Sequence, residues 1–161
     1  MAIKLDETVK SLLRNFDTVK ILATVDRDGK PHVTCKDSIR LNNKGNLEYD
    51  EFIESSQTNK NLVFAIWFRK QVAINILGRN KTSYQIKGTP VKAVICGKRF
   101  EERYKKLKEE QGADLSAIWI IEPEEVIEET LAVRKAVEET LHPLLRHLDI
   151  FLDESYRGTG S

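Results

Sequence analysis

A polar cluster at residues 55–61 is the strongest candidate for chemistry in this 161-residue sequence. It lies between an expected strand and an expected helix, and it reads Ser55, Ser56, Gln57, Thr58, Asn59, Lys60 and Asn61. Hydroxyl, amide and ammonium groups beside the free N–H groups of a helix N-terminus are suited to hold a phosphate. Because the same residue types also cap helices and build polar loops, the spacing leaves both interpretations open.

The residue types that usually carry catalysis form no recognised pattern. The sequence contains no glycine-rich phosphate loop, nucleophile elbow, CxxC or HExxH motif. His32 is interpreted as an exposed strand residue, and His142 and His147 are poorly spaced for one metal ion. Cys35 and Cys96 also lack metal spacing, and Cys35 is interpreted as a small core residue. We therefore expect no metal site, and no residue is assigned a catalytic role.

Length and composition indicate one folded domain, or one domain with an appendage. Hydrophobic residues make up 40% and charged residues 32% of the chain, which excludes disordered and collagen-like classes. No apolar run approaches the roughly 20 residues that a membrane-spanning helix needs. The first residues, MAIKLDET, lack the apolar region of a signal peptide, and the two cysteines fit a reducing compartment. These features predict a cytoplasmic protein without a membrane partner.

The charges are unevenly distributed along the chain. The formal net charge is +1, yet residues 79–108 carry a net +8 and residues 109–154 a net −10. The basic block would suit a nucleic-acid-binding arm. Alternatively, the two blocks face each other, within one subunit or across a dimer. We favour the second hypothesis because a near-neutral protein gains little long-range steering toward nucleic acid.

The hydrophobic pattern predicts strands joined mainly by tight turns. A helix is expected over 6–16 and another over 98–111, while the run 62–68 is ambiguous between helix and strand. Strands are expected over 19–25, 31–41, 47–52, 71–77, 84–96 and 115–121. Pro123 is expected to close the last strand, and Gly88 and Pro90 to mark a bulge or an edge. Tight turns favour an antiparallel barrel over a parallel sheet.

Three segments together carry a family resemblance. ILATVDRDGKPHVTCKDSI, then ESSQTNKNL, then QVAINILGRNKTSYQIKGTPV resemble the pyridoxamine 5'-phosphate oxidase-like, FMN-binding split-barrel family. The resemblance covers about residues 8–122. It implies a mainly β fold, a six-stranded antiparallel split β-barrel with helices. The barrel domain would span 1–122, a C-terminal helical extension 123–157 and a flexible tail 158–161; the extension resembles one found in an uncharacterised branch of the family.

The resemblance also implies a cofactor site. Such proteins are homodimers that bind FMN in clefts between their subunits. The FMN phosphate would be held by Ser55, Ser56, Gln57, Thr58 and Lys60, with Asn61 as support. Lys36, Asp37 and Ser38 would lie near the flavin. Trp119 would form the partner subunit's wall of the cleft, or else be an ordinary core or interface tryptophan.

The function implied is that of an FMN-dependent oxidoreductase with an unknown substrate. The sequence lacks an arginine pair matching the phosphate site of the vitamin B6 oxidases, and Gln57 stands where a lysine could be expected. Vitamin B6 oxidation is therefore not predicted. The alternatives are a non-catalytic flavin-binding or electron-carrier protein, a split barrel that binds haem or a deazaflavin, and a small barrel that binds nucleic acid through 79–108.

Overall fold

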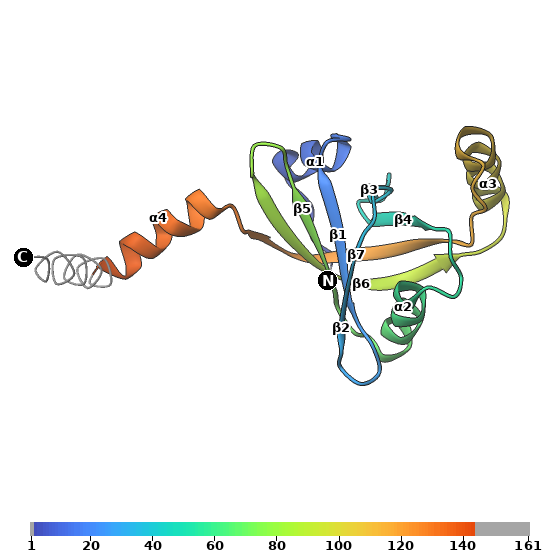
Figure 1. Ribbon diagram of the computed structural model, residues 1–161, viewed down its shortest axis with the longest axis horizontal. Coiled ribbons are helices and arrows are strands. Elements are labelled where there is room, and N and C mark those ends of the chain that lie inside the picture. Colours follow the sequence, from blue (N-terminus) through green and yellow to red (C-terminus); the bar gives the residue numbers. More distant parts are fainter. Residues whose placement is uncertain (1, 144–161) are drawn as a thin grey trace, which may run out of the picture.

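The computed structural model describes residues 2–143, which form a curled antiparallel sheet flanked by helices (Figure 1). The order of the seven strands across the sheet is β2-β1-β5-β6-β7-β4-β3. The strands are β1 (Val19–Val25), β2 (Pro31–Cys35), β3 (Arg40–Leu41), β4 (Leu47–Glu51), β5 (Val72–Leu77), β6 (Ser83–Val94) and β7 (Ala117–Glu128). The helices are α1 (Glu7–Arg14), α2 (Gln57–Phe68), α3 (Lys98–Gln111) and α4 (Leu131–Leu141).

The mainly β, antiparallel split-barrel prediction is confirmed, with seven strands among the described residues instead of six. The extra strand arises because the run predicted at 31–41 is interrupted. β2 ends at Cys35, the amide of Ile39 donates to the carbonyl of Lys36 (3.2 Å), and β3 then pairs with β4. β2 and β3 are the two edges of the sheet yet adjoin in the chain, so the sheet must curl to bring its edges near each other.

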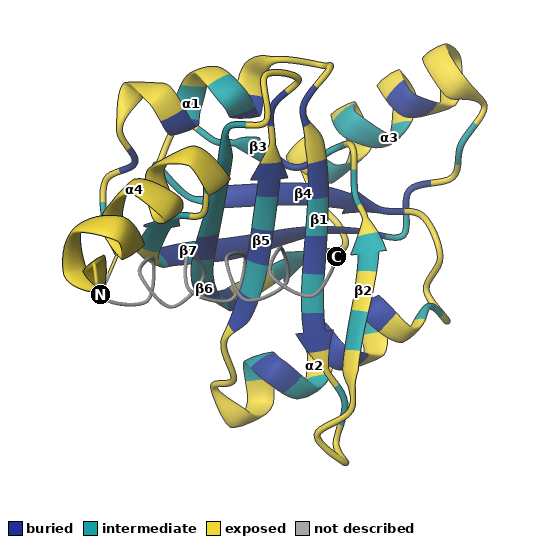
Figure 2. Cartoon of the chain, turned by 60° about the vertical axis from the view of Figure 1, so that its left-hand side comes forward, coloured by how far each residue is buried: buried dark blue, intermediate teal, exposed yellow. Residues whose placement is uncertain are grey.

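The barrel core follows from the alternation of side chains along each strand. Leu22, Ile74 and Ile86 are each at most 1% exposed and belong to one cluster. β4 is buried along its whole length, and so is the first part of β7, from Ala117 to Ile121 (Figure 2). A second, smaller cluster of Leu107, Leu115 and Ile118 packs α3 against the outer side of β7.

The ambiguous apolar run after the polar cluster folds as helix α2. Its N-cap is Ser56, whose hydroxyl accepts the amide of Asn59 (3.0 Å). One face of α2 turns toward the sheet at helical spacing, and its buried residues are Thr58, Asn61, Leu62 and Ala65. Trp67 and Phe68 lie on the outer side, 78% and 62% exposed. The long apolar run therefore forms a helix with one face packed in the core and the other exposed to solvent.

The last strand does not close at Pro123, contrary to the sequence prediction. β7 continues to Glu128, and Gly88 of β6 pairs with Pro123 where the register shifts between Lys87 and Gly88. A proline is tolerated in a sheet at such a bulge because no ladder hydrogen bond is required of it. The bulge expected at Gly88 and Pro90 is confirmed. The first six residues of the expected extension, 123–128, therefore belong to the sheet.

Beyond the sheet, the described part of the extension is α4, which stands away from the barrel (Figure 1). None of its residues is buried. The rest of the expected extension, from 144 to 157, and the expected tail 158–161 lie outside the described residues. None of the helices between residues 2 and 143 has the length and apolar character that crossing a membrane requires.

Candidate functional site

The N-terminus of α2 presents polar groups of the kind predicted for phosphate binding. The helix-cap interpretation is confirmed for Ser56. The amides of Gln57 and Thr58 belong to the first turn and have no hydrogen-bond partner within residues 2–143. Ser55 and Lys60 are exposed beside them. Two free amides, a hydroxyl and an ammonium group fit an anionic group such as a phosphate.

Two of the predicted phosphate ligands turn toward the barrel. The Thr58 hydroxyl lies 3.2 Å from Nε2 of His32 on β2, and the residue is 2% exposed. The Asn61 amide donates to the Thr24 hydroxyl of β1 (2.9 Å) and accepts from Gln57 (2.7 Å). These contacts fasten the start of α2 to β1 and β2. His32, interpreted from sequence as an exposed strand residue, is half-buried and belongs to this arrangement.

At the far end of β2, Lys36 takes part in a buried polar group. Its Nζ lies 3.2 Å from Oε2 of Glu51, which also accepts the Tyr49 hydroxyl at 3.0 Å. Glu51 is 1% exposed. Burial, reinforced by the neighbouring Glu51 carboxylate, raises the pKa of Tyr49 well above its ordinary value, so the phenol stays a donor. This group holds Lys36 at the end of β2.

Asp37 and Ser38 form the turn after β2. Asp37 is exposed, and its carbonyl accepts from Nζ of Lys20 at 3.4 Å. Burial lowers the pKa of Lys20. The Ser38 hydroxyl accepts the amide of Asp50 (2.9 Å) and so joins this turn to β4. The three predicted flavin-side residues therefore lie together at one edge of the sheet.

Three arginines surround two buried carboxylates next to this turn. Arg40 donates to both oxygens of Asp50 (3.0 and 3.1 Å), and Arg103 of α3 donates to the same carboxylate at 2.6 Å. Glu48 accepts from Arg40 and Arg99. Hydrogen bonding to Asp50 raises the pKa of Arg103. No local sequence pattern reveals this cluster, because its members come from three separate segments of the chain. The one signal in the sequence is the presence of acidic residues at 48, 50 and 51 inside an expected strand.

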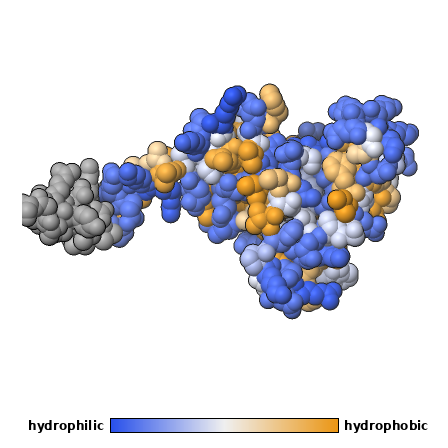
Figure 3. Space-filling view, in the orientation of Figure 1, coloured by the Kyte–Doolittle hydropathy of each residue, from blue (hydrophilic) through white to orange (hydrophobic). Residues whose placement is uncertain are grey.

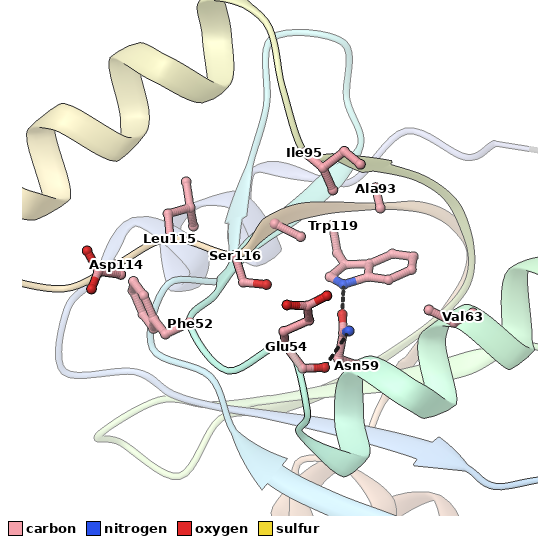
Figure 4. A pocket seen from close by; sticks show the side chains of 11 residues that line it. Phe52, Glu54, Asn59, Val63, Ala93, Ile95, Asp114, Leu115, Ser116 and Trp119 are labelled. Atoms are coloured by element: carbon pink, nitrogen blue, oxygen red, sulfur yellow. Dashed lines mark hydrogen bonds between the residues drawn. The ribbon is translucent and has the colours of Figure 1, made fainter.

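Trp119 lies in the barrel core at 2% exposure, as the core interpretation expected. Its indole N–H donates to Oδ1 of Asn59 (2.8 Å), and the Asn59 amide donates to the carbonyl of Glu54 (2.9 Å; Figure 4). From the sequence, Asn59 is only one member of the polar cluster, without a role of its own. The structure instead makes Asn59 the link between α2, β7 and the loop before α2.

Three hollows share lining residues, two of them beside α2 and one beside α3. The Trp119 hollow, of about 530 Å³, includes Phe52, Glu54, Asn59, Val63, Ile95 and Trp119. The Lys60 hollow, of about 420 Å³, lies between the β1–β2 turn and α2 and shares Asn59 and Val63 with it. The Lys36 hollow, of about 410 Å³, contains residues 35–38, Asp50 and Arg103, and shares Phe52. Each volume is within the range of small-molecule sites.

Seven of the ten predicted site residues line one of these hollows, whereas Ser55, Ser56 and Thr58 line none of the three. Gln57, Lys60 and Asn61 line the Lys60 hollow, and Lys36, Asp37 and Ser38 line the Lys36 hollow, while Trp119 lines the third. Strand β2 runs between the Lys60 hollow and the Lys36 hollow, because His32 at its start contacts α2 and Lys36 directly follows its end. Within residues 2–143, no three His, Cys, Asp or Glu side chains are grouped so as to hold a metal ion.

No family model and no curated protein matches the sequence, whereas several solved structures match the fold. HupZ of Group A Streptococcus has a TM-score of 0.64 at 24% identity, over 79% of this chain and 95% of HupZ. A Lactobacillus delbrueckii protein provisionally named a pyridoxamine 5'-phosphate oxidase has a TM-score of 0.60 at 23% identity, over 77% and 93%. An FMN-binding protein from Syntrophomonas wolfei has a TM-score of 0.60 at 16% identity, over 78% and 86%.

Proteins that share this fold are described with different cofactors. Besides the FMN-binding protein, an F420 reductase and HutZ, the haem storage protein of Vibrio cholerae, also match. The predicted resemblance is confirmed at the level of the fold. The fold alone does not select among FMN, a deazaflavin and haem.

Proposed function

We propose that this chain, which has the split-barrel fold of the pyridoxamine 5'-phosphate oxidase-like proteins, is an FMN-binding flavoprotein and an oxidoreductase. The observation that carries the proposal is the arrangement along β2. The free amides and Lys60 at the start of α2 lie at one end of this strand, and the Lys36 hollow lies at the other. A strand rises about 3.3 Å per residue, so His32 and Lys36 are separated by about 13 Å.

This arrangement suits an elongated ligand with one anionic end. The amides of Gln57 and Thr58, the Ser55 hydroxyl and Lys60 would hold the phosphate of FMN. Lys36, Asp37 and Ser38 would lie beside the flavin at the other end. Thr58 and Asn61 would not contact the phosphate; they would hold the phosphate-binding start of α2 in place, because their side chains fasten α2 to the barrel. When bound, the flavin supplies the electron chemistry, and the protein supplies binding and orientation.

We further propose a homodimer with the flavin at the subunit interface. β2 is an edge strand, and Val33 at its centre is 62% exposed. A second copy covering this edge would exclude water from the flavin and bury apolar surface. The way in which the two copies pack would determine which subunit supplies each contact to the flavin.

Two other functions fit the same fold. A flavin-binding electron carrier would use the same residues without turnover, and a barrel that binds haem or a deazaflavin would use the hollows differently. Reduction of the purified yellow protein by NAD(P)H, followed by reoxidation with an added acceptor, would support the oxidoreductase. A flavin that no pyridine nucleotide or quinone reduces would support the carrier.

An absorbance scan of the purified protein, followed by titration with FMN, tests the cofactor. We expect flavin bands, and we expect Lys60→Gln to weaken FMN binding about tenfold, since charge-assisted contacts to phosphate are the strong ones. Lys105→Gln, on the exposed surface of α3, is the matched control and should leave the affinity unchanged. A colourless protein that takes up no FMN would contradict the proposal, and a haem spectrum would replace it.

A further inference from the structure

We propose that the Trp119 hollow binds a second small molecule, an aromatic or otherwise apolar compound that carries a cationic amine. The proposal that a small molecule binds here depends only on this hollow. The further step, that this molecule is the substrate of a bound flavin, rests on the proposed function. That step is suggested by position, because the hollow shares Asn59 with the Lys60 hollow and Phe52 with the Lys36 hollow.

The hollow has an apolar and comparatively rigid side, although Glu54, Asn59, Asp114 and Ser116 also line it. Trp119 and Ala93 lie on paired strands of the sheet, and Val63 projects from α2 on the opposite side (Figure 4). The Trp119 ring is fixed because its N–H is bonded to Asn59, which is itself held by Glu54 and Ser56. Phe52 and Ile95 are 39% and 65% exposed at its rim. Such walls favour a flat or apolar body.

One carboxylate in the hollow, that of the solvent-exposed Glu54, has no protein partner among residues 2–143. Glu54 points into the hollow toward Ser116 and the Trp119–Asn59 pair (Figure 4). Among residues 2–143 its carboxylate forms no ion pair and no hydrogen bond. The other acid of the hollow, Asp114, is already bonded to Tyr104 and Lys108 (both 2.8 Å). Glu54 is therefore the group that a ligand donor would meet.

The hollow also differs from its neighbours in charge. No lysine, arginine or histidine lines it, and its two charged residues are both acids. The neighbouring hollows instead combine both signs: Arg27 and Lys60 with Asp26 and Asp28 in the Lys60 hollow, and Lys36 and Arg103 with Asp37 and Asp50 in the Lys36 hollow. A phosphate or carboxylate in the Trp119 hollow would meet Glu54 without a compensating cation. An ammonium group would form a charge-assisted hydrogen bond with it. The hollow is thus selective for amines over anions.

The test compares two ligands with the same ring and opposite charges, 2-phenylethylamine and 3-phenylpropionate. Trp119 fluorescence reports binding in a Trp67→Phe variant, because the chain has two tryptophans and Trp67 is exposed. Calorimetry on the unmodified protein gives the same constants independently. Both are measured without flavin and again with FMN added, so that failure of the flavin assignment leaves this result readable.

We expect the amine to bind at least about tenfold more tightly than the acid. Glu54→Gln, which keeps the shape and removes the charge, should abolish that preference. Glu109→Gln on exposed α3 makes the same charge change outside the hollow and should preserve it. Equal affinities, a preference that survives in Glu54→Gln, or no binding of either compound would overturn the proposal; in the last case, a second copy of the chain covering the hollow becomes the better account.

Discussion

Asn59 joins three parts of the candidate site through one side chain. Its oxygen accepts the Trp119 indole N–H, its amide donates to the carbonyl of Glu54, and its backbone N–H is capped by Ser56. His32 with Thr58 and Thr24 with Asn61 form two further cross-links between α2 and the sheet. Buried polar groups that are fully paired fix one arrangement, because losing a partner leaves the other group desolvated. The polar cluster is therefore as much a docking surface for α2 as a ligand site.

Tyr49 supplies a prediction about alkaline pH. The folded state raises its pKa, so the stability linked to this group is fully present below its ordinary pKa of about 10 and is lost as the pH rises further. We expect the unfolding free energy to fall above pH 10 by up to about 1.4 kcal/mol per pH unit from this group. Urea denaturation across this pH range measures the slope.

Tyr49→Phe should flatten that alkaline slope, although loss of the bond to Glu51 should cost about 1 kcal/mol at neutral pH. Tyr104→Phe is the comparison: it removes an exposed phenol whose pKa is also raised, by its hydrogen bond to Asp114, and it should flatten the slope less than Tyr49→Phe does because water screens that contact. An identical slope in the wild type and Tyr49→Phe would show that Tyr49 ionises freely in the folded protein.

At the scale of elements, the bulge between β6 and β7 lets a proline-containing strand continue past the barrel. A Cβ added at Gly88 would overlap the carbonyl oxygen of Glu122 and lie 2.9 Å from Cγ2 of Ile121. Both neighbours belong to a paired strand and cannot move aside cheaply. The bulge therefore requires a glycine at this position.

Gly88→Ala should accordingly destabilise the protein by about 1–3 kcal/mol, measured as a lower urea midpoint. Lys92→Ala lies in the same strand at an exposed position and should stay within about 0.5 kcal/mol of the wild type. If Gly88→Ala matched that control, the two strands would have to be further apart at the bulge than they are here.

The elements also show what the sequence could and could not predict. Periodicity identified the strand at 19–25 with the same bounds, and the glycine and proline at 88 and 90 predicted the bulge. The predicted end of β7 at Pro123 was wrong, because a proline terminates a strand only where the ladder needs its missing N–H or where its ring would clash. The family resemblance directed attention to the start of α2, but Asn59, Glu54 and the arginine cluster depend on long-range contacts that no local pattern encodes.

At the scale of the whole molecule, the two charge blocks meet only in part. On the paired strands, Lys87 lies 3.2 Å from Glu125, so some cancellation is internal to the sheet. α3 and α4, however, lie at opposite ends of the molecule (Figure 1). Apolar surface also interrupts the hydrophilic exterior over the sheet and at α4 (Figure 3). Among residues 2–143, a contact between α3 and α4 would therefore require a second copy.

α4 provides the prediction at this scale. Its exposed apolar side chains include Leu131, Val137 and Leu141, which are 46–77% exposed. If α4 contributes to the proposed dimer, deleting 131–161 should yield a monomer by sedimentation velocity. The deletion begins at 131 because the Thr130 hydroxyl still accepts the amide of Ser83 in the sheet (3.0 Å).

A point variant keeps the chain whole in the same experiment. Val137→Asp should weaken the dimer, since it places a charge in the apolar stripe, while Lys135→Asp should not. A dimer that persists in the deletion and in Val137→Asp would show that α4 is not needed for self-association, and that the proposed interface at the β2 edge holds without it.

The carboxylates of Asp50 and Glu48 have a consequence for how the sequence can diverge. Asp50 is 1% exposed and is shared by Arg40 and Arg103, which lie 63 positions apart in the chain. Removing one partner of a buried ion pair costs more than replacing the whole group with apolar residues. A substitution at one of these positions is therefore tolerated only together with substitutions of its partners. Related sequences should either retain the acids with their arginines or have replaced them together.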